Sequence, residues 1–225
     1  SSVFSSARLN GRCSAVPCDL DGTLVDSGDS VTRAWTRYAD EIGRSPAEIL
    51  RMCHGVRTTE VIEALDLGQP VMPAALRVES WITDDGAHPT PGAVEFLTAL
   101  PSDRWAVVTS SLRPTALSRF TDSPLPEPLV AITAEDVEVG KPDPTCYRAG
   151  AAALGVAAVD CVVVEDAPAG VAAGKAAGMR VLAVTTTHDA QELSAADVIV
   201  ASLDHVRVTV TGRQLLLRTL PSPKL

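Results

Sequence analysis

The sequence predicts an α/β fold in which a mostly parallel sheet is covered by helices on both faces and carries an all-helical insertion after its first strand. Two observations lead to this prediction. From residue 91 onward, short apolar runs alternate with stretches of helical spacing, which is typical of a parallel sheet with crossover helices. Residues 26–88 show helical spacing instead, without a convincing strand. With 225 residues and a hydrophobic fraction of 46%, the chain can bury the core that such a fold needs.

The elements follow one another in a regular order. An apolar run that ends at Cys18 is the first strand, and Gly22 breaks the extended pattern. The first helix of the insertion begins at Asp26 or Ser27 and stops at Gly43, because apolar residues recur at helical spacing between these points. The later helices are predicted at 46–52, 58–67, 73–83, 91–100, 113–120, 144–154 and 167–177. The later strands are predicted at 105–108, 129–132, 161–164, 180–184 and 198–200.

These elements divide the chain into a core of residues 14–25 and 89–205 and a helical insertion of residues 26–88. Residues 1–13 are expected to be a frayed leader, because their apolar side chains are scattered among polar ones and form neither a signal peptide nor a membrane span. Residues 206–225 are a tail, with a small hairpin expected around Gly212.

Composition narrows the partners of this protein. A formal net charge of -9 argues against broad binding to nucleic acids or anionic membranes, so we expect a small anionic ligand instead. The five cysteines are scattered and never form a Cys-x-x-Cys pair, which is typical of reduced cysteines in a cytoplasmic protein. We expect the protein to be a monomer.

Two carboxylates, Asp19 and Asp21, follow the first strand. The carboxyl end of a strand in an open α/β sheet is where ligands usually bind. Carboxylates this close repel each other unless a cation neutralises them or one keeps a proton, and both remedies suit an enzyme that handles phosphate. An Asp-rich turn that caps the next helix is an alternative for these residues taken alone. A calcium loop of the EF-hand type is excluded, because its sixth position would be Leu24 instead of glycine and its twelfth would be Ser30.

Polar side chains also stand at two other points along the predicted sheet. Thr109 and Ser110 follow the strand at 105–108. Hydroxyls at this point can cap the next helix, or they can donate hydrogen bonds to a phosphate together with the first backbone amides of that helix. Lys141 stands in a Gly-Lys-Pro turn, in a chain with three lysines and sixteen arginines. A compact ammonium in a stiff turn suits a binding site at the edge of the sheet. Taken alone, Lys141 fits equally well as an ordinary lysine on the protein surface.

A second acidic pair, Glu165 and Asp166, ends the apolar strand at 161–164. Paired acids at the end of a buried strand repel each other and lose hydration unless a cation is present, although they also suit the start of the following helix. Magnesium prefers hard oxygen ligands and takes one or two carboxylates. Asp19 and Asp166 supply that number, which predicts a Mg2+ site.

In this order and at these strand ends, the acidic, hydroxyl and lysine positions resemble the haloacid dehalogenase superfamily of phosphatases over residues 14–202. The resemblance rests on Asp-Leu-Asp-Gly-Thr-Leu-Val-Asp-Ser from Asp19, on Glu-Asp-Ala-Pro-Ala-Gly-Val from Glu165, and on Thr109 and Lys141. With Cys-His-Gly-Val-Arg-Thr from Cys53, the chain looks like the sugar-phosphate and glycerol-phosphate phosphatase branch, which includes 2-deoxyglucose 6-phosphate phosphatases. The resemblance implies a Rossmann-like core and a small helical cap, residues 26–88, that closes over the substrate.

The resemblance also implies a role for each residue. Asp19 is the expected nucleophile, which forms an aspartyl-phosphate, and Asp21 is the expected acid and base for the leaving oxygen and the attacking water. Thr109 and Lys141 are expected to hold the phosphoryl oxygens. Glu165 is expected to support Lys141 or a metal-bound water. The implied Mg2+ ligands are Asp19, Asp21 through its backbone carbonyl, and Asp166.

The substrate that the resemblance implies is a small phosphorylated sugar or polyol, hydrolysed by a Mg2+-dependent phosphomonoesterase. Expected substrate-binding residues lie beside Thr109, at Ser110, and in the cap, at His54, Gly55 and Arg57. Arg57 suits anionic or hydroxylated ligands. A packed or solvent-facing histidine is at least as good an interpretation of His54.

Other functions compete on the same fold. One is a phosphosugar mutase, but the β-phosphoglucomutases that this chain resembles carry a histidine where it has Val31. Another is a phosphosugar sensor without activity, against which the intact catalytic set argues. The related dehalogenases lack the second aspartate, so Asp21 argues against them. Pro17 is unexpected in the predicted first strand, because a proline in a central strand removes one hydrogen bond of the sheet. The strand must therefore either contain a bulge or tolerate the missing bond.

Overall fold

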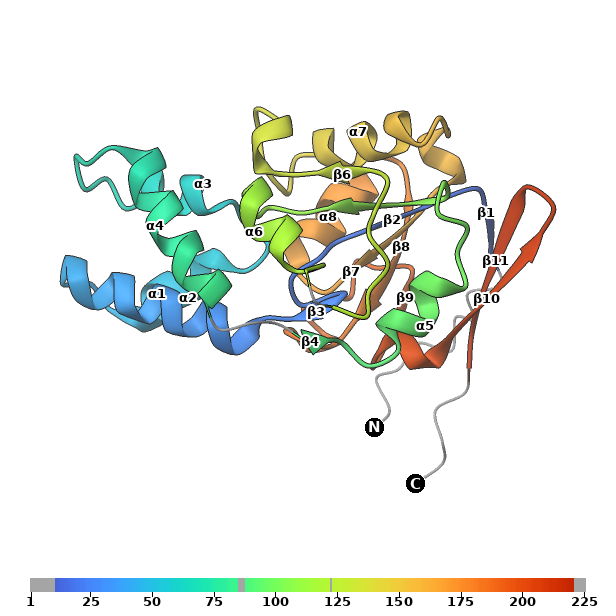
Figure 1. The fold of residues 1–225 in the computed structure, drawn as a ribbon, viewed down its shortest axis with the longest axis horizontal. Helices are drawn as coiled ribbons and strands as arrows, with labels where there is room; N and C mark the ends of the chain where they lie inside the picture. Colours follow the sequence, from blue (N-terminus) through green and yellow to red (C-terminus); the bar gives the residue numbers. More distant parts are fainter. Residues whose placement is uncertain (1–10, 85–87, 122, 221–225) are drawn as a thin grey trace, which may run out of the picture.

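The computed structural model describes residues 11–84, 88–121 and 123–220, and Figure 1 shows an α/β core with a helical layer at one end and a hairpin at the other. The core is a six-stranded sheet in the order β6-β5-β2-β7-β8-β9, and all its neighbouring strands are parallel. The predicted α/β fold is therefore confirmed. Its strands are β2 Val16–Cys18, β5 Trp105–Val108, β6 Ala131–Ile132, β7 Val162–Glu165, β8 Arg180–Val184 and β9 Val198–Val200.

Helices cover both faces of this sheet. Successive side chains of a strand point to opposite faces, so neighbouring residues of β5 enter different clusters: Val107 packs with α5, and Val108 packs with α7 and α8. Helix α8 approaches the sheet closely because Gly174 has no Cβ, and a Cβ there would lie 2.9 Å from Val181 Cγ2. The core helices are α5 Ala93–Thr98, α6 Arg113–Ser118, α7 Thr145–Ala153 and α8 Pro168–Ala176. Short 3-10 helices lie at Ala134–Asp136, Ala158–Asp160 and Leu203–His205.

Four helices between the first core strand and α5 form a separate layer, at the left of Figure 1. They are α1 Gly28–Ile42, α2 Pro46–Cys53, α3 Thr58–Ala64 and α4 Val71–Asp84. Their apolar faces pack around Trp35, Ile49 and Val78, so the layer has a hydrophobic cluster of its own. The chain enters and leaves it through an antiparallel pair that the helical spacing does not reveal, β3 Val25–Asp26 and β4 His88–Pro89.

A three-stranded antiparallel sheet lies at the opposite end of the molecule. Strands β10 Val206–Thr211 and β11 Gln214–Thr219 form a hairpin, and Gly212 takes the left-handed conformation in its turn, with φ 58°. Residues 11–13, predicted as part of a frayed leader, instead form β1 Gly11–Cys13 and pair with β11. The rest of the predicted leader, residues 1–10, and residues 221–225 of the tail lie outside the described residues.

Pro17 lies inside β2 without a bulge. The parallel register with β5 runs unbroken through Val16, Pro17 and Cys18. On the side of β7, the Ala15 carbonyl accepts a hydrogen bond from the Val162 amide (3.1 Å), and the Asp19 amide donates to the Val164 carbonyl (2.9 Å). The missing N–H therefore removes one donor between two intact contacts, and the strand tolerates the defect.

Some predicted bounds shift for local reasons. Helix α3 ends at Ala64 instead of residue 67, because Asp66 adopts a left-handed conformation with φ 46°. Strand β6 begins at Ala131 instead of residue 129, because this edge strand forms its ladder only with the last two residues of β5.

All five cysteines are free and buried, and burial raises the pKa of Cys53 to about 12. Within the described ranges, no helix is both long and apolar enough to cross a membrane.

Candidate active site

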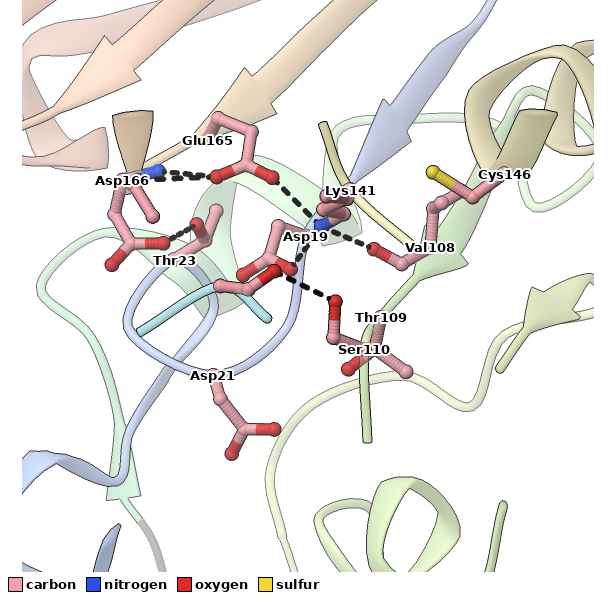
Figure 2. Close-up of polar contacts among 12 residues, drawn as sticks. Asp19, Asp21, Thr23, Val108, Thr109, Ser110, Lys141, Cys146, Glu165 and Asp166 are labelled. Carbon is pink, nitrogen blue, oxygen red and sulfur yellow. Dashed lines mark hydrogen bonds and ion pairs between the residues drawn. The ribbon is translucent and has the colours of Figure 1, made fainter. Parts of the chain in front are cut away.

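The carboxyl edge of the sheet gathers the predicted polar residues, as Figure 2 shows. Asp19 follows β2, and Thr109 follows β5. Glu165 is the last residue of β7, and Asp166 comes next. Lys141 reaches this edge from the loop before α7. Side chains from four distant segments of the chain thus meet. Three of these segments do so because parallel strands end at the same edge, and a loop brings Lys141 to them.

Lys141 is the centre of this site. Its ammonium is buried and donates hydrogen bonds from Nζ to Asp19 Oδ1 (2.6 Å), to Glu165 Oε1 (2.7 Å) and to the Val108 carbonyl (3.1 Å). Burial alone would lower the pKa of Lys141, but the carboxylates of Asp19 and Glu165 outweigh it and raise this pKa well above its ordinary value. Lys141 is therefore a fixed positive charge beside Asp19, and the interpretation as a surface lysine is wrong.

Glu165 holds Lys141 in place. Its Oε1 accepts from Lys141 and from the Tyr147 hydroxyl (2.7 Å), and its Oε2 accepts from the amides of Asp166 (2.9 Å) and Ala167 (3.1 Å). Both carboxylate oxygens are thus fully engaged within the protein. Gly170, in the first turn of α8, leaves the necessary room, because a Cβ at this position would overlap Glu165 Oε1. Of its two expected roles, this geometry favours the support of Lys141.

Asp19 and Asp166 can hold a hard cation. One oxygen each of Asp19, Glu165 and Asp166 lies within 4.8 Å of the others, and all three residues are buried. Burial raises the pKa of Asp166 to about 7, with the Glu165 charge adding to the effect. Burial also raises the pKa of Asp19 well above its usual range, although Lys141 opposes this. Lys141 offsets only part of the negative charge, so a divalent cation with a preference for oxygen fits the donor set.

The Asp166 carboxylate is oriented by two hydroxyls that the sequence patterns did not single out. Thr23 donates to Oδ1 (2.8 Å), and Thr187 donates to Oδ2. The loop after β2 can pass this close because Gly22 has φ 91°, and a Cβ there would overlap Asp166 Oδ2. The glycine of the Asp-x-Asp-Gly motif is thus needed so that the loop can pack against Asp166.

Asp21 points away from Asp19 and Lys141 in Figure 2. Its Oδ2 accepts a hydrogen bond from the Ser111 hydroxyl (2.8 Å), and its Oδ1 pairs with the buried guanidinium of Arg119 (Nη2 at 3.1 Å). Its carboxylate is not part of the Asp19, Glu165 and Asp166 cluster. Among the groups of Asp21, its backbone carbonyl therefore remains as the expected metal ligand. Neither partner of Asp21 stands out in the sequence, because a single loop serine and a single arginine at the end of α6 carry no distinctive pattern.

The hydroxyls after β5 have different partners. Thr109 Oγ1 accepts a hydrogen bond from the Ser111 amide (3.1 Å) within the loop before α6, but it does not cap that helix, whose N-cap residue is Leu112. Thr109 also lines the same cavity as Asp19. Ser110 Oγ donates to the Gly55 carbonyl (2.9 Å) and so connects the core to the helical layer. Ser110 and Gly55 also line the cavity, so both remain candidates for substrate contact.

A cavity of about 70 Å3 lies between the core and the helical layer. The core contributes Asp19, Asp21 and Thr109 to its wall. From the helical layer, His54 lines it, with its ring 5.6 Å from that of His188 in an edge-on arrangement. Burial and His188 lower the pKa of His54. The remaining residues of the helical layer on this wall are mostly apolar: Gly28, Val31, Trp35, Cys53, Gly55, Val56, Thr58, Glu79 and Ile82.

Arg57 does not line this cavity. Its guanidinium donates to the carbonyls of Val137 (2.9 Å) and Glu138 (2.8 Å), and it pairs with Glu60 (2.6 Å). Glu60 in turn accepts from the Gly140 amide (2.9 Å). Arg57 thus ties the helical layer to the loop that carries Lys141, and its predicted contact with substrate finds no support in this arrangement.

Several known proteins are similar to this chain in sequence and in fold. Residues 13–178 match the model of the haloacid dehalogenase-like hydrolase family. The chain is 40% identical over 206 residues to hexitol phosphatase A from Escherichia coli (strain K12), with 88% of this chain and 95% of the relative covered. It is 34% identical over 216 residues to glycerol-1-phosphate phosphohydrolase 2 from Saccharomyces cerevisiae (strain ATCC 204508 / S288c), with 89% and 86% covered.

Among solved structures, β-phosphoglucomutase from Clostridium difficile has the same fold, with a TM-score of 0.75 and 20% identity over 87% of this chain and 93% of that one. The family predicted from the sequence is confirmed, and so is its sugar-phosphate and glycerol-phosphate phosphatase branch. This chain belongs to the haloacid dehalogenase-like hydrolases.

Proposed function

We propose that this protein is a Mg2+-dependent phosphomonoesterase that hydrolyses a small sugar or polyol phosphate through an aspartyl-phosphate on Asp19. The observation that carries the proposal is the contact of Lys141 Nζ with Asp19 Oδ1 at 2.6 Å. This contact holds the Asp19 carboxylate at the cavity wall and places a positive charge beside the position that a phosphoryl group would occupy. The curated relatives, a hexitol phosphatase and a glycerol-1-phosphate phosphohydrolase, support the substrate class.

The proposed reaction begins when Asp19 attacks the phosphorus atom and the bond to the sugar oxygen breaks. Asp21 donates a proton to that leaving oxygen, for which its carboxyl group turns away from Ser111 and Arg119. Lys141 and Thr109 hold the phosphoryl oxygens. A water molecule then loses a proton to Asp21 and attacks phosphorus, which releases phosphate and restores the Asp19 carboxylate.

Asp19, Asp166 and the backbone carbonyl of Asp21 would hold the Mg2+ ion. When bound, the ion would keep both carboxylates ionised and neutralise charge on the phosphoryl group. Thr23 and Thr187 keep Asp166 oriented toward the cluster. The helical layer serves as a cap that shields the reacting groups from water, because its residues form part of the wall of the cavity that Asp19 lines.

The test is phosphate release from sorbitol 6-phosphate and glycerol 1-phosphate, with Mg2+ and with an excess of chelator. We expect turnover that requires Mg2+ and is abolished in Asp19→Asn. Isomerised sugar phosphate without free phosphate would favour a mutase instead, and Val31 at the cavity wall already argues against that alternative. Turnover that survives complete metal removal would contradict the proposed mechanism.

A further inference from the structure

Glu79, on cap helix α4, has a buried carboxylate oxygen that lacks a hydrogen bond of normal geometry. The residue is 3% exposed and lines the same cavity as Asp19 and Asp21. Its Oε1 accepts a hydrogen bond from the Thr58 hydroxyl (2.6 Å). The Thr115 hydroxyl and the Leu112 backbone also interact with the carboxylate and lower its pKa, but among the described residues its buried Oε2 has no hydrogen bond of normal geometry. A buried carboxylate oxygen without a donor is costly, and native structures seldom contain one without a functional reason.

The surroundings of Glu79 indicate what would complete it. Its neighbours on the cap wall include the apolar side chains of Val31, Trp35 and Ile82. Within the described part of the chain, neither lysine nor arginine lines the cavity. In the proposed reaction the phosphate end of a substrate lies beside Asp19 and Thr109, and the other end faces the cap wall, where Glu79 is the carboxylate. A hydroxyl group can donate to the Glu79 carboxylate, whereas a second anionic group would be repelled by it and would find no lysine or arginine on the described wall.

We propose that Glu79 is a specificity-determining residue that accepts a hydrogen bond from a substrate hydroxyl and selects uncharged polyol or sugar monophosphates over phosphorylated acids. This inference rests on the proposed phosphatase function and deepens it. A site that is built to hydrogen-bond a hydroxyl rejects analogues without one, because its own buried group is then left unpaired. A carboxylate in place of that hydroxyl adds repulsion to the lost hydrogen bond.

Sorbitol 6-phosphate and 6-phosphogluconate are a matched pair for the test, because they differ chiefly in a hydroxymethyl or a carboxylate at the end remote from phosphate. Phenyl phosphate, which has no hydroxyl, reports the chemistry alone. The full-length chain with Mg2+ is assayed for kcat and KM on all three at about pH 8, above the pKa of about 7 to which burial raises Glu79. We expect the wild type to prefer sorbitol 6-phosphate over 6-phosphogluconate by at least about tenfold in kcat/KM, the size expected for one lost polar contact.

Two substitutions separate charge from hydrogen bonding. Glu79→Gln removes the charge at constant shape, and we expect it to bring the two kcat/KM values to within about threefold, mainly through a lower KM for 6-phosphogluconate. Glu79→Ala is expected to lower kcat/KM for sorbitol 6-phosphate by about tenfold or more while phenyl phosphate changes less than about twofold. Glu63→Gln, an exposed carboxylate on cap helix α3, is the matched control and is expected to match the wild type on all three substrates.

Several outcomes would overturn the inference. A wild type that hydrolyses phenyl phosphate but shows no preference within the matched pair would refute it while leaving the phosphatase function intact. An unchanged preference in Glu79→Gln would also refute it. Equal losses on all three substrates together with a lower Tm would mean that Glu79 only holds α3 and α4 together through Thr58. Absence of phosphate release from all three substrates would overturn the proposed function and this inference with it.

Discussion

Replacing Glu79 by glutamine should change how the stability of the protein depends on pH. Burial, with a smaller contribution from the Asp21 charge, raises the pKa of Glu79 from 4.5 to about 7. Below pH 4.5 this group is protonated in the folded and the unfolded chain alike. Between pH 4.5 and about 7 the folded chain keeps a proton that the unfolded chain has lost, so the free energy of unfolding falls as pH rises. Above pH 7 the contribution is constant.

The size of this effect follows from the same two values. At about 1.4 kcal/mol per pH unit, the wild type loses on the order of 3 kcal/mol from this group between pH 4.5 and 7. Glu79→Gln does not titrate, so its free energy of unfolding should rise relative to the wild type by that amount over the same range. Other buried acids, such as Asp166, are present in both proteins and cancel in the difference.

Urea unfolding of both proteins in chelator, at pH 4.5, 5.5, 6.5 and 7.5, measures this difference directly. Glu63→Gln, an exposed carboxylate of the same cap, should run parallel to the wild type. If the free energies of unfolding of Glu79→Gln and of the wild type change in parallel with pH across this range, the pKa of Glu79 is not raised in the folded chain. That result would refute the prediction.

Three further predictions concern the catalytic core. Lys141→Met should abolish turnover and cost about 3–5 kcal/mol in urea unfolding, because two buried carboxylates lose their partner; Lys175→Met, at a half-exposed surface pair, should cost less than about 1 kcal/mol. Tyr147→Phe should lower the free energy of unfolding by about 1–3 kcal/mol through its lost bond to Glu165, while measurable phosphatase activity remains. Gly170→Ala should lower kcat more than KM rises, since its Cβ would displace Glu165 and with it Lys141; an unchanged kcat would contradict this.

The sequence predicted the core of the site because simple geometry was enough. Asp19, Thr109 and Asp166 each follow an apolar strand, and parallel strands bring such residues to one edge. Residues that act from helices were harder to recognise. Glu79 and Arg119 are single polar residues in helical patterns, and only the packed structure shows that they face the cavity and Asp21. For the same reason, the side chain of Arg57 turned out to point to a loop of the core.

Long-range pairing was the other limit of prediction. Residues 11–13 have no strand pattern of their own, and they become β1 because β11, some two hundred residues later, offers them a free edge. Pro17 was recognised as a departure, but the sequence could not decide between a bulge and a tolerated defect. The unbroken register with β5 decides for the latter, since the neighbouring amides keep their partners.

The short pair of β3 and β4 has a consequence for how such a protein can evolve. Because the chain leaves and rejoins the core at two adjacent, hydrogen-bonded strands, the whole helical layer is topologically a hairpin loop that has acquired its own hydrophobic core. Closure of that loop depends only weakly on its length. Helices can therefore be lengthened, exchanged or resurfaced inside it without disturbing the strand that carries Asp19. The residues that line the cavity from this segment can thus diversify while those at the carboxyl edge of the sheet stay unchanged.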